Sequence, residues 1–137
     1  MTRRESREQA FALMFEKSFR DKPVEELAVE AAEARDIGTS GFSMTLARGT
    51  ETHLEEIDER IAACSHKWNK ERISRVALAV MRVSVYEMLY EGDIPASVSI
   101  NEAVELAKKY GGEDDSAFVN GILGTIARSL PPETDAQ

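Results

Sequence analysis

Apolar residues recur at steps of three and four along most of the chain, which is the spacing of one face of an α-helix. The first such run follows Thr2. Thr2 and Glu5 have the three-residue spacing of a capping box, in which each side chain accepts a hydrogen bond from the other residue's backbone N–H. The pattern therefore predicts a helix that begins after Thr2. Its apolar side consists of Ala10, Phe11, Met14 and Phe15, with Phe19 as a candidate extension.

Two further helices are expected before the middle of the chain. One starts after Asp21, with Pro23 near its first position, and ends by Gly38. A longer helix is predicted from about Ser40 to Cys64. Its apolar side keeps the same spacing throughout and includes Phe42, Leu46, Gly49, His53, Ile57 and Ile61.

The segment from Ile73 to Tyr90 is rich in valine, which favours β-strands locally, yet its length and regular period indicate a helix. Because it is apolar on most sides, we expect it to be the central, buried helix, closed by Gly92. After a break at Pro95, Ser99 and Glu102 predict a second capping box and the start of another helix.

The last helix is predicted to take its cap from residues 114–116 and to stop at Pro131. It contains Asn120–Gly121, a dipeptide that is typical of tight β-hairpins. The helical period of the surrounding residues outweighs that signal. We expect Gly121 and Gly124 to let another helix approach closely, and Asn101 and Asn120 to hold the last two helices in register, a functional role being the alternative.

No strand is predicted, so the fold class is all-α. With 137 residues the chain forms one domain, over residues 1–130, followed by a flexible tail over residues 131–137. One cysteine, no apolar signal segment and no long apolar run indicate a cytoplasmic protein that crosses no membrane.

The net charge of −8 is unevenly distributed along the chain. Residues 1–22 hold six basic and four acidic residues, a net charge of +2, which leaves −10 for the remainder. Salt screens charges over roughly 8–10 Å, so a basic end on an acidic body can still bind phosphates locally. The alternative is that these charges form an ordinary solvated helix face.

The sequence contains no recognisable catalytic or cofactor motif. His53 and His66 have no acidic or thiol partner at a useful spacing, and no phosphate-binding loop, dinucleotide fingerprint or nucleophile elbow is present. We therefore expect no enzymatic activity, no catalytic residue, no metal site and no nucleotide cofactor.

The candidate binding residues suggest single-stranded RNA. Arg3, Arg4 and Arg7 can make forked contacts with phosphates and stack on unpaired bases. Phe15 and Phe118 are candidate stacking platforms near polar helix starts, although either residue alone is more often part of a core.

Residues 99–123, SINEAVELAKKYGGEDDSAFVNGIL, resemble the signature of the NusB family of bacterial transcription antitermination factors. RRESREQAFALMF at residues 3–15, VMRVSVYEML at 80–89 and DIP at 93–95 support the resemblance. It implies a NusB-like domain of about six to seven helices in two packed halves.

The resemblance also implies partners and a function. Members of the family pair with NusE, a small-subunit ribosomal protein, and bind the single-stranded boxA element of nascent RNA. In the transcription elongation complex with other Nus factors, they promote processive transcription of ribosomal RNA operons. Carried over by alignment, the RNA-binding residues are Arg4, Arg7, Phe15, Asp114 and Phe118, with Lys108 and Lys109 adding phosphate contacts.

This sequence departs from the family pattern at two places. Glu5 interrupts the arginine motif, and Ala77–Leu78 replaces an acidic residue followed by a basic one. Two other functions are considered. NusB-like domains also resemble the RNA-binding part of certain ribosomal RNA cytosine methyltransferases, but 137 residues leave no room for a cofactor-binding sheet. A helical protein-interaction or homodimer scaffold without intrinsic RNA binding is the remaining alternative.

Overall fold

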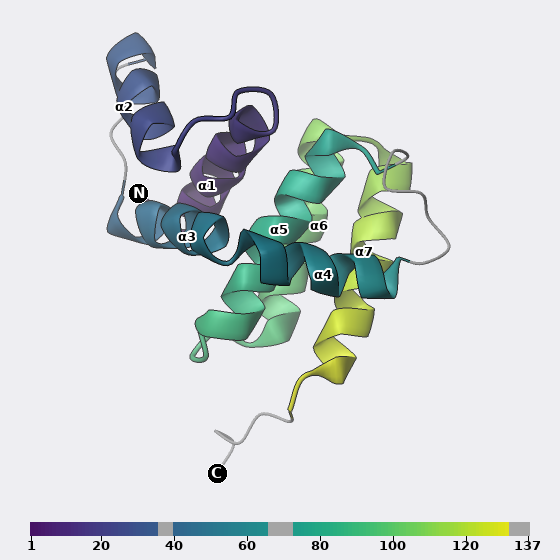
Figure 1. Cartoon of the computed structure of the whole chain (residues 1–137). Coiled ribbons are helices and arrows are strands. Elements are labelled where there is room, and N and C mark those ends of the chain that lie inside the picture. The colour runs from purple at the N-terminus through teal and green to yellow at the C-terminus, as the bar shows by residue number, and fades with distance from the viewer. Residues whose placement is uncertain (36–39, 66–72, 132–137) are drawn as a thin grey trace.

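The computed structural model describes residues 1–35, 40–65 and 73–131, and this part of the chain contains helices and no strand, which confirms the all-α fold class. Figure 1 shows their arrangement. The helices are α1 (Arg3–Lys17), α2 (Val24–Arg35), α3 (Gly41–Thr52), α4 (Leu54–Cys64), α5 (Arg75–Tyr90), α6 (Ala96–Tyr110) and α7 (Glu113–Ser129).

Helix α5 lies at the centre of the domain, as its apolar sequence predicts. It contacts α1, α3, α4, α6 and α7. Its N-terminus is capped by Ser74, whose hydroxyl accepts a hydrogen bond from the Ala77 backbone N–H at 3.0 Å. Met81 and Val85 in its middle are fully buried. A valine-rich segment is thus helical because surrounding helices cover it on nearly every side.

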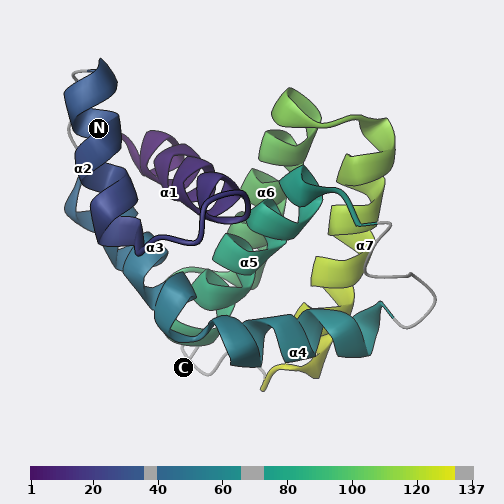
Figure 2. The same ribbon diagram turned by 45° about the horizontal axis from the view of Figure 1, so that its top comes forward.

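The remaining helices form two groups around α5, which Figures 1 and 2 show from two directions. Helices α1, α2 and α3 pack together on one side, and α6 and α7 form a helical hairpin on the other. Helix α4, at the bottom of Figure 2, contacts both α5 and α7. The guanidinium of Arg82 donates two hydrogen bonds to the Asp58 carboxylate, at 2.9 and 2.8 Å, and so joins α5 to α4.

The observed helix starts agree with the predicted capping boxes only in part. Thr2 and Glu5 form the predicted capping box, with hydrogen bonds of 2.8 and 3.0 Å. The second predicted box is wrong, because α6 begins at Ala96, directly after Pro95. Ser99 therefore lies inside α6, where it is buried. Proline is favoured at a helix entrance, and here it starts the helix one turn earlier than the capping pattern indicates.

The single long helix predicted from Ser40 to Cys64 is two helices. His53 separates α3 from α4, with backbone angles φ −105° and ψ 21° that are not helical. Its ring stacks on Tyr90, with 4.2 Å between ring centroids. The break lets α3 pack on α1 while α4 turns to reach α7. The predicted helix end at Gly38, His66 and tail residues 132–137 lie outside the described residues.

The close helix approach expected at Gly121 and Gly124 is also wrong. A Cβ atom on Gly121 would meet nothing within 4 Å, and one on Gly124 would meet only the Arg128 side chain at 3.5 Å. The close approach occurs instead at Gly49 of α3, where a Cβ atom would lie 2.2 Å from ring carbons of Tyr86 in α5. Within the described ranges, no helix combines the length and apolar character that a membrane span requires.

Candidate nucleic-acid interface

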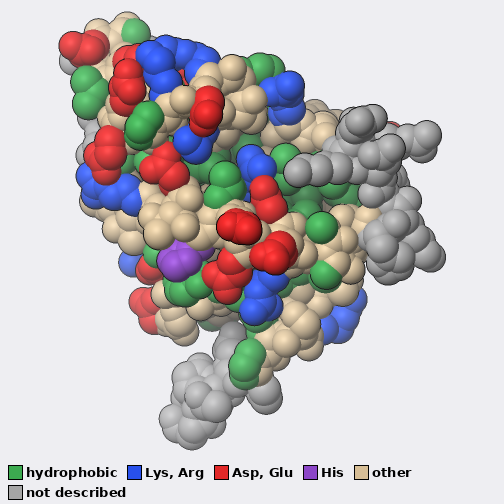
Figure 3. All heavy atoms as spheres, in the orientation of Figure 1, with side chains coloured by type: hydrophobic (Ala, Val, Ile, Leu, Met, Phe, Trp, Pro, Cys, Tyr) green, Lys and Arg blue, Asp and Glu red, His purple; other side chains and the backbone are tan. Residues whose placement is uncertain are grey.

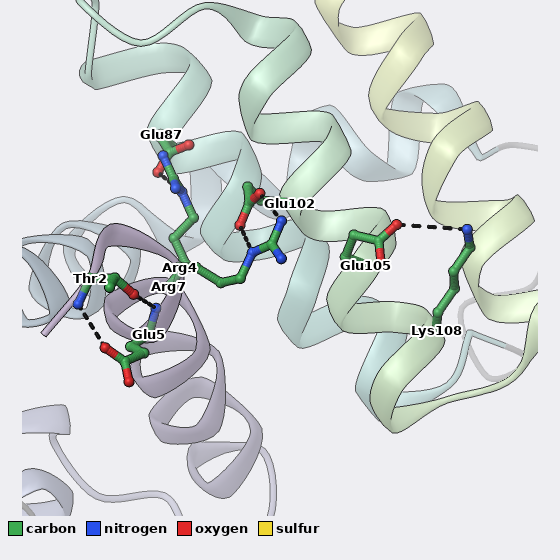
Figure 4. Close-up of polar contacts among 8 residues, drawn as sticks. All are labelled: Thr2, Arg4, Glu5, Arg7, Glu87, Glu102, Glu105 and Lys108. Carbon is green, nitrogen blue, oxygen red and sulfur yellow. Dashed lines mark hydrogen bonds and ion pairs between the residues drawn. The ribbon is translucent and has the colours of Figure 1, made fainter.

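The first turns of α1 lie beside α6, so that the predicted arginines meet acidic residues from distant parts of the chain (Figure 4). Arg4 makes a forked pair with Glu102, in which Nε donates to Oε1 at 3.0 Å and an Nη atom donates to Oε2 at 2.8 Å. Those hydrogen bonds hold the pKa of the Glu102 carboxyl below its usual range. The Arg4 side chain remains 65% exposed, so a phosphate can reach it.

Arg7 does not lie on the surface with Arg4. Its side chain is 10% exposed, and its Nε donates to Oε2 of Glu87 at 2.8 Å. Glu87 belongs to α5 and is 1% exposed; its other carboxylate oxygen accepts a hydrogen bond from the Ser99 hydroxyl of α6. The prediction of an accessible Arg7 is therefore corrected, because a buried carboxylate requires a paired cation. Figure 4 shows this pair beside the Arg4–Glu102 pair.

Arg3 is an exposed cation at the same end of α1. Its guanidinium carbon lies 3.9 Å from the centroid of the Phe42 ring in α3, a cation–π contact. Such a contact leaves the N–H donors at the edge of the guanidinium free to point outward. Arg3 and Arg4 are thus the two basic residues of this motif that face solvent.

The C-terminal end of α6 adds two further cations. Nζ of Lys109 lies 2.8 Å from a carboxylate oxygen of Glu8 in α1, and the Tyr110 hydroxyl donates to the same oxygen. The hydrogen bonds from Lys109 and Tyr110 lower the pKa of Glu8. Lys108 forms a weaker ion pair with Glu105, at 3.7 Å (Figure 4). Both lysines are exposed.

A row of aromatic rings extends along α1 from Tyr110, the residue that also bonds Glu8. Tyr110 lies 5.2 Å from Phe11, Phe11 lies 5.9 Å from Phe15, and Phe15 lies 5.1 Å from Phe19, between ring centroids. Phe15 is half-buried, so only part of its ring can meet a base. Phe19 is 60% exposed. The guanidinium carbon of Arg75 lies 4.3 Å from the centroid of its ring, a cation–π contact.

The sequence matches a known family over nearly its whole length. A model of the NusB family matches residues 4–128. The chain belongs to the NusB family. The transcription antitermination protein NusB of Geobacter sulfurreducens is 40% identical over 132 residues, which cover 94% of this chain and 96% of that protein. The resemblance of residues 99–123 is thereby confirmed.

Solved NusB structures are similar to this fold. A crystal structure of the antitermination factors NusB and NusE in complex with double-stranded RNA matches with a TM-score of 0.84 and 26% sequence identity, covering 93% of this chain and 97% of that one. T. maritima NusB matches with a TM-score of 0.83 and 36% identity, covering 96% and 94% of the two chains. These matches confirm a NusB-like fold.

The last two candidate residues of this NusB-family chain lie on α7, which follows Tyr110 after only two glycines. Asp114 is exposed in the first turn of α7. Phe118 is half-buried and packs against the hydrophobic core. The beginning of α7 therefore lies next to the end of α6 that carries Lys108 and Lys109, as a composite surface requires.

Sequence reasoning missed the acidic partners and some of the aromatic residues. Glu8, Glu102 and Tyr110 are separated from their contacts in the chain by about a hundred residues, and no local pattern joins them. The contact between Phe19 and Arg75 likewise could not be predicted from local sequence. The spacing of Phe11, Phe15 and Phe19 at steps of four was a usable signal.

Acidic side chains elsewhere restrict where RNA can bind. On the face shown in Figure 3, they gather over α4, which carries Glu55, Glu56 and Asp58. That surface repels phosphates. In the described part of the chain, no group of three or more histidine, cysteine, aspartate or glutamate residues could hold a metal ion.

Proposed function

We propose that this protein is a transcription antitermination factor that binds boxA of nascent RNA together with NusE and promotes processive transcription of ribosomal RNA operons. The observation that carries the proposal is family membership over residues 4–128, together with the likeness to a NusB–NusE complex that contains RNA. On this proposal the protein acts in the cytoplasm and catalyses no reaction.

The geometry supports an RNA surface formed by the start of α1, the end of α6 and the start of α7. Its accessible cations are Arg3, Arg4, Lys108 and Lys109. Arg4 and Lys109 are already paired with carboxylates, so a phosphate must displace Glu102 or Glu8, or share the cation with it. Exposed ion pairs contribute only about 0–1 kcal/mol each, and such an exchange is therefore inexpensive.

Titration of labelled boxA RNA into the protein, with and without NusE, tests the proposal. We expect tight, salt-dependent binding by the pair and weaker binding by the protein alone. RNA of the same length and composition in scrambled order is the control. Equal affinity for both RNAs in the presence of NusE would contradict sequence-specific recognition.

A variant sharpens the test. Glu102→Gln keeps the shape of the side chain and removes the charge that competes for Arg4. We expect boxA affinity to rise by about two- to fivefold, the modest gain that loss of one exposed competing charge gives. Glu25→Gln is the matched control, since Glu25 pairs with Arg48 on α2 and α3, away from the proposed surface.

A further inference from the structure

The far end of α1 carries an exposed aromatic ring with a cation held against it. Phe19 lies just beyond the last residue of α1, Lys17, and is largely exposed. The guanidinium of Arg75, the first residue of α5, lies over its ring. An Nη atom of Arg75 also donates a hydrogen bond to the backbone carbonyl of Ser18 at 2.7 Å. Two contacts thus fix the guanidinium on the ring, although Ser18 and Arg75 are 57 residues apart in the chain.

Arg75 is a cation without a carboxylate partner. Within the described residues it makes no ion pair, whereas Arg20 and Arg82 each bind a carboxylate. Arginine has five N–H donors, and the contact with Ser18 uses one of them. The Arg75 side chain is exposed. Its other donors and the face turned away from Phe19 are therefore accessible to a ligand.

The charge at this end of the domain is mixed. Glu16 lies three residues before Phe19, and its carboxylate accepts a hydrogen bond from Arg20 at 2.6 Å. Asp21 is exposed and lies 3.8 Å from Nζ of Lys17. The acidic start of α7 lies at the same end, the upper one in Figure 1. Net charge therefore does not select the ligand, and the choice depends on the ring and its guanidinium.

This pair ends an aromatic row that begins at the proposed RNA surface. From Tyr110 at the end of α6, the row passes through two phenylalanines of α1 to Phe19, with 5.1–5.9 Å between neighbouring ring centroids. Both end rings are exposed and both carry a cation, since Nζ of Lys109 lies 5.3 Å from the Tyr110 centroid. Stacking rings combined with cation–π contacts are typical of surfaces that bind single-stranded nucleic acids.

We propose that an unpaired base of the bound RNA stacks on the guanidinium of Arg75, which Phe19 supports from the other side. A guanidinium can stack on a base while its edge N–H groups donate to a phosphate. Helix α1 has 15 residues and is about 22 Å long, so this contact lies well outside those made at its start. The inference rests on the proposed function and extends the RNA surface to the far end of α1.

The alternative ligand is a protein partner. The core of a protein interface is depleted of charged residues. Phe19 is instead flanked in sequence by charged residues, with Glu16 before it and Arg20 and Asp21 after it. One exposed ring among charges forms no apolar interface core, whereas a single base needs only one stacking surface. An RNA base therefore fits this pair better than a protein does.

Binding of boxA RNA, extended by flanking nucleotides at both ends, to the full chain paired with NusE tests the inference. The central variant is Arg75→Lys, which keeps the charge and removes the planar stacking surface. We expect it to weaken RNA binding about tenfold, as for the loss of one base stack, with the salt dependence unchanged. Phe19→Leu should cause a similar loss. The double variant should lose little more, because the two side chains act as one unit.

Arg48→Lys is the matched control. Arg48 is exposed and pairs with Glu25, away from this surface, so the variant should keep the wild-type RNA affinity. The Phe19 and Arg75 variants should keep the wild-type melting temperature, because both side chains are exposed. Wild-type RNA affinity in Arg75→Lys overturns the stack and leaves the proposed function standing. Absence of boxA binding by the wild type with NusE overturns both.

Binding of NusE without RNA is measured for the same variants. We expect Arg75→Lys and Phe19→Leu to bind NusE as the wild type does. If Arg75→Lys weakens NusE binding by as much as it weakens RNA binding, the pair contacts the protein partner and the inference is wrong.

Discussion

Two arginines three residues apart in α1 have opposite roles. Arg4 is largely exposed and pairs with Glu102 at the surface, whereas Arg7 is buried and neutralises Glu87. Both looked equivalent in the sequence, where only their membership of one basic cluster was visible. The difference arises from Glu87, which lies 80 residues away in α5 and needs a cation because it is cut off from water.

Replacing each arginine by alanine should separate these roles. Arg7→Ala leaves Glu87 buried without its partner, and we expect a loss of about 3–5 kcal/mol in the free energy of unfolding, measured by urea denaturation. Arg4→Ala should leave stability nearly unchanged, because exposed ion pairs contribute little. Instead, it should reduce the salt dependence of boxA binding by a slope of about 0.7, the value for one phosphate on a single strand. The same large stability loss in both variants would refute the distinction.

At the scale of the elements, the sequence predicted which segments are helical better than how they meet. The positions of α1, α5 and α7 follow from the hydrophobic period, and the capping box places the start of α1. The cap predicted at residues 114–116 is wrong, because α7 begins at Glu113, directly after Gly112. The break at His53 was hidden, because the apolar spacing continues across it and only the different packing partners of α3 and α4 require a turn. Close helix contact was assigned to the wrong glycine for the same reason, since contact depends on the partner helix.

Glycine substitutions test that assignment. Gly49→Ala forces a methyl group into the Tyr86 ring, and we expect a loss of about 1–3 kcal/mol from overpacking. Gly121→Ala meets open space in a helix, where alanine is favoured by up to about 1 kcal/mol, so stability should stay equal or rise. Urea denaturation midpoints of both variants provide the measurement. A stabilised Gly49→Ala protein would show that the α3–α5 contact is looser than described.

For the whole molecule, ion pairs between separate segments of the chain make the free energy of unfolding depend on pH. Partner cations lower the pKa of Glu102, Glu8 and Glu30 in the folded state. A carboxyl with a depressed pKa contributes stability above its unfolded pKa, about 4.3, and loses it as the pH falls toward the folded value. The folded protein should therefore weaken progressively below about pH 5, despite the relief of its net negative charge.

Denaturation by urea at several pH values between 7 and 3 tests this expectation. We expect the wild-type free energy of unfolding to fall over the acidic part of the range, and the fall to be smaller in a Glu8→Gln, Glu102→Gln double variant. Identical pH profiles for the two proteins would show that these surface pairs contribute nothing to stability.

The central position of α5 has a consequence for synthesis on the ribosome. Helices α1 and α3 bury Met14 and Leu46 in a core that α5 completes, yet α5 is made later. The 38 residues that follow Thr52, up to Tyr90, take about 2–8 s to add at roughly 5–20 residues per second. During that interval the nascent N-terminal half exposes apolar surface to chaperones. The final structure is reached only after the middle of the chain emerges.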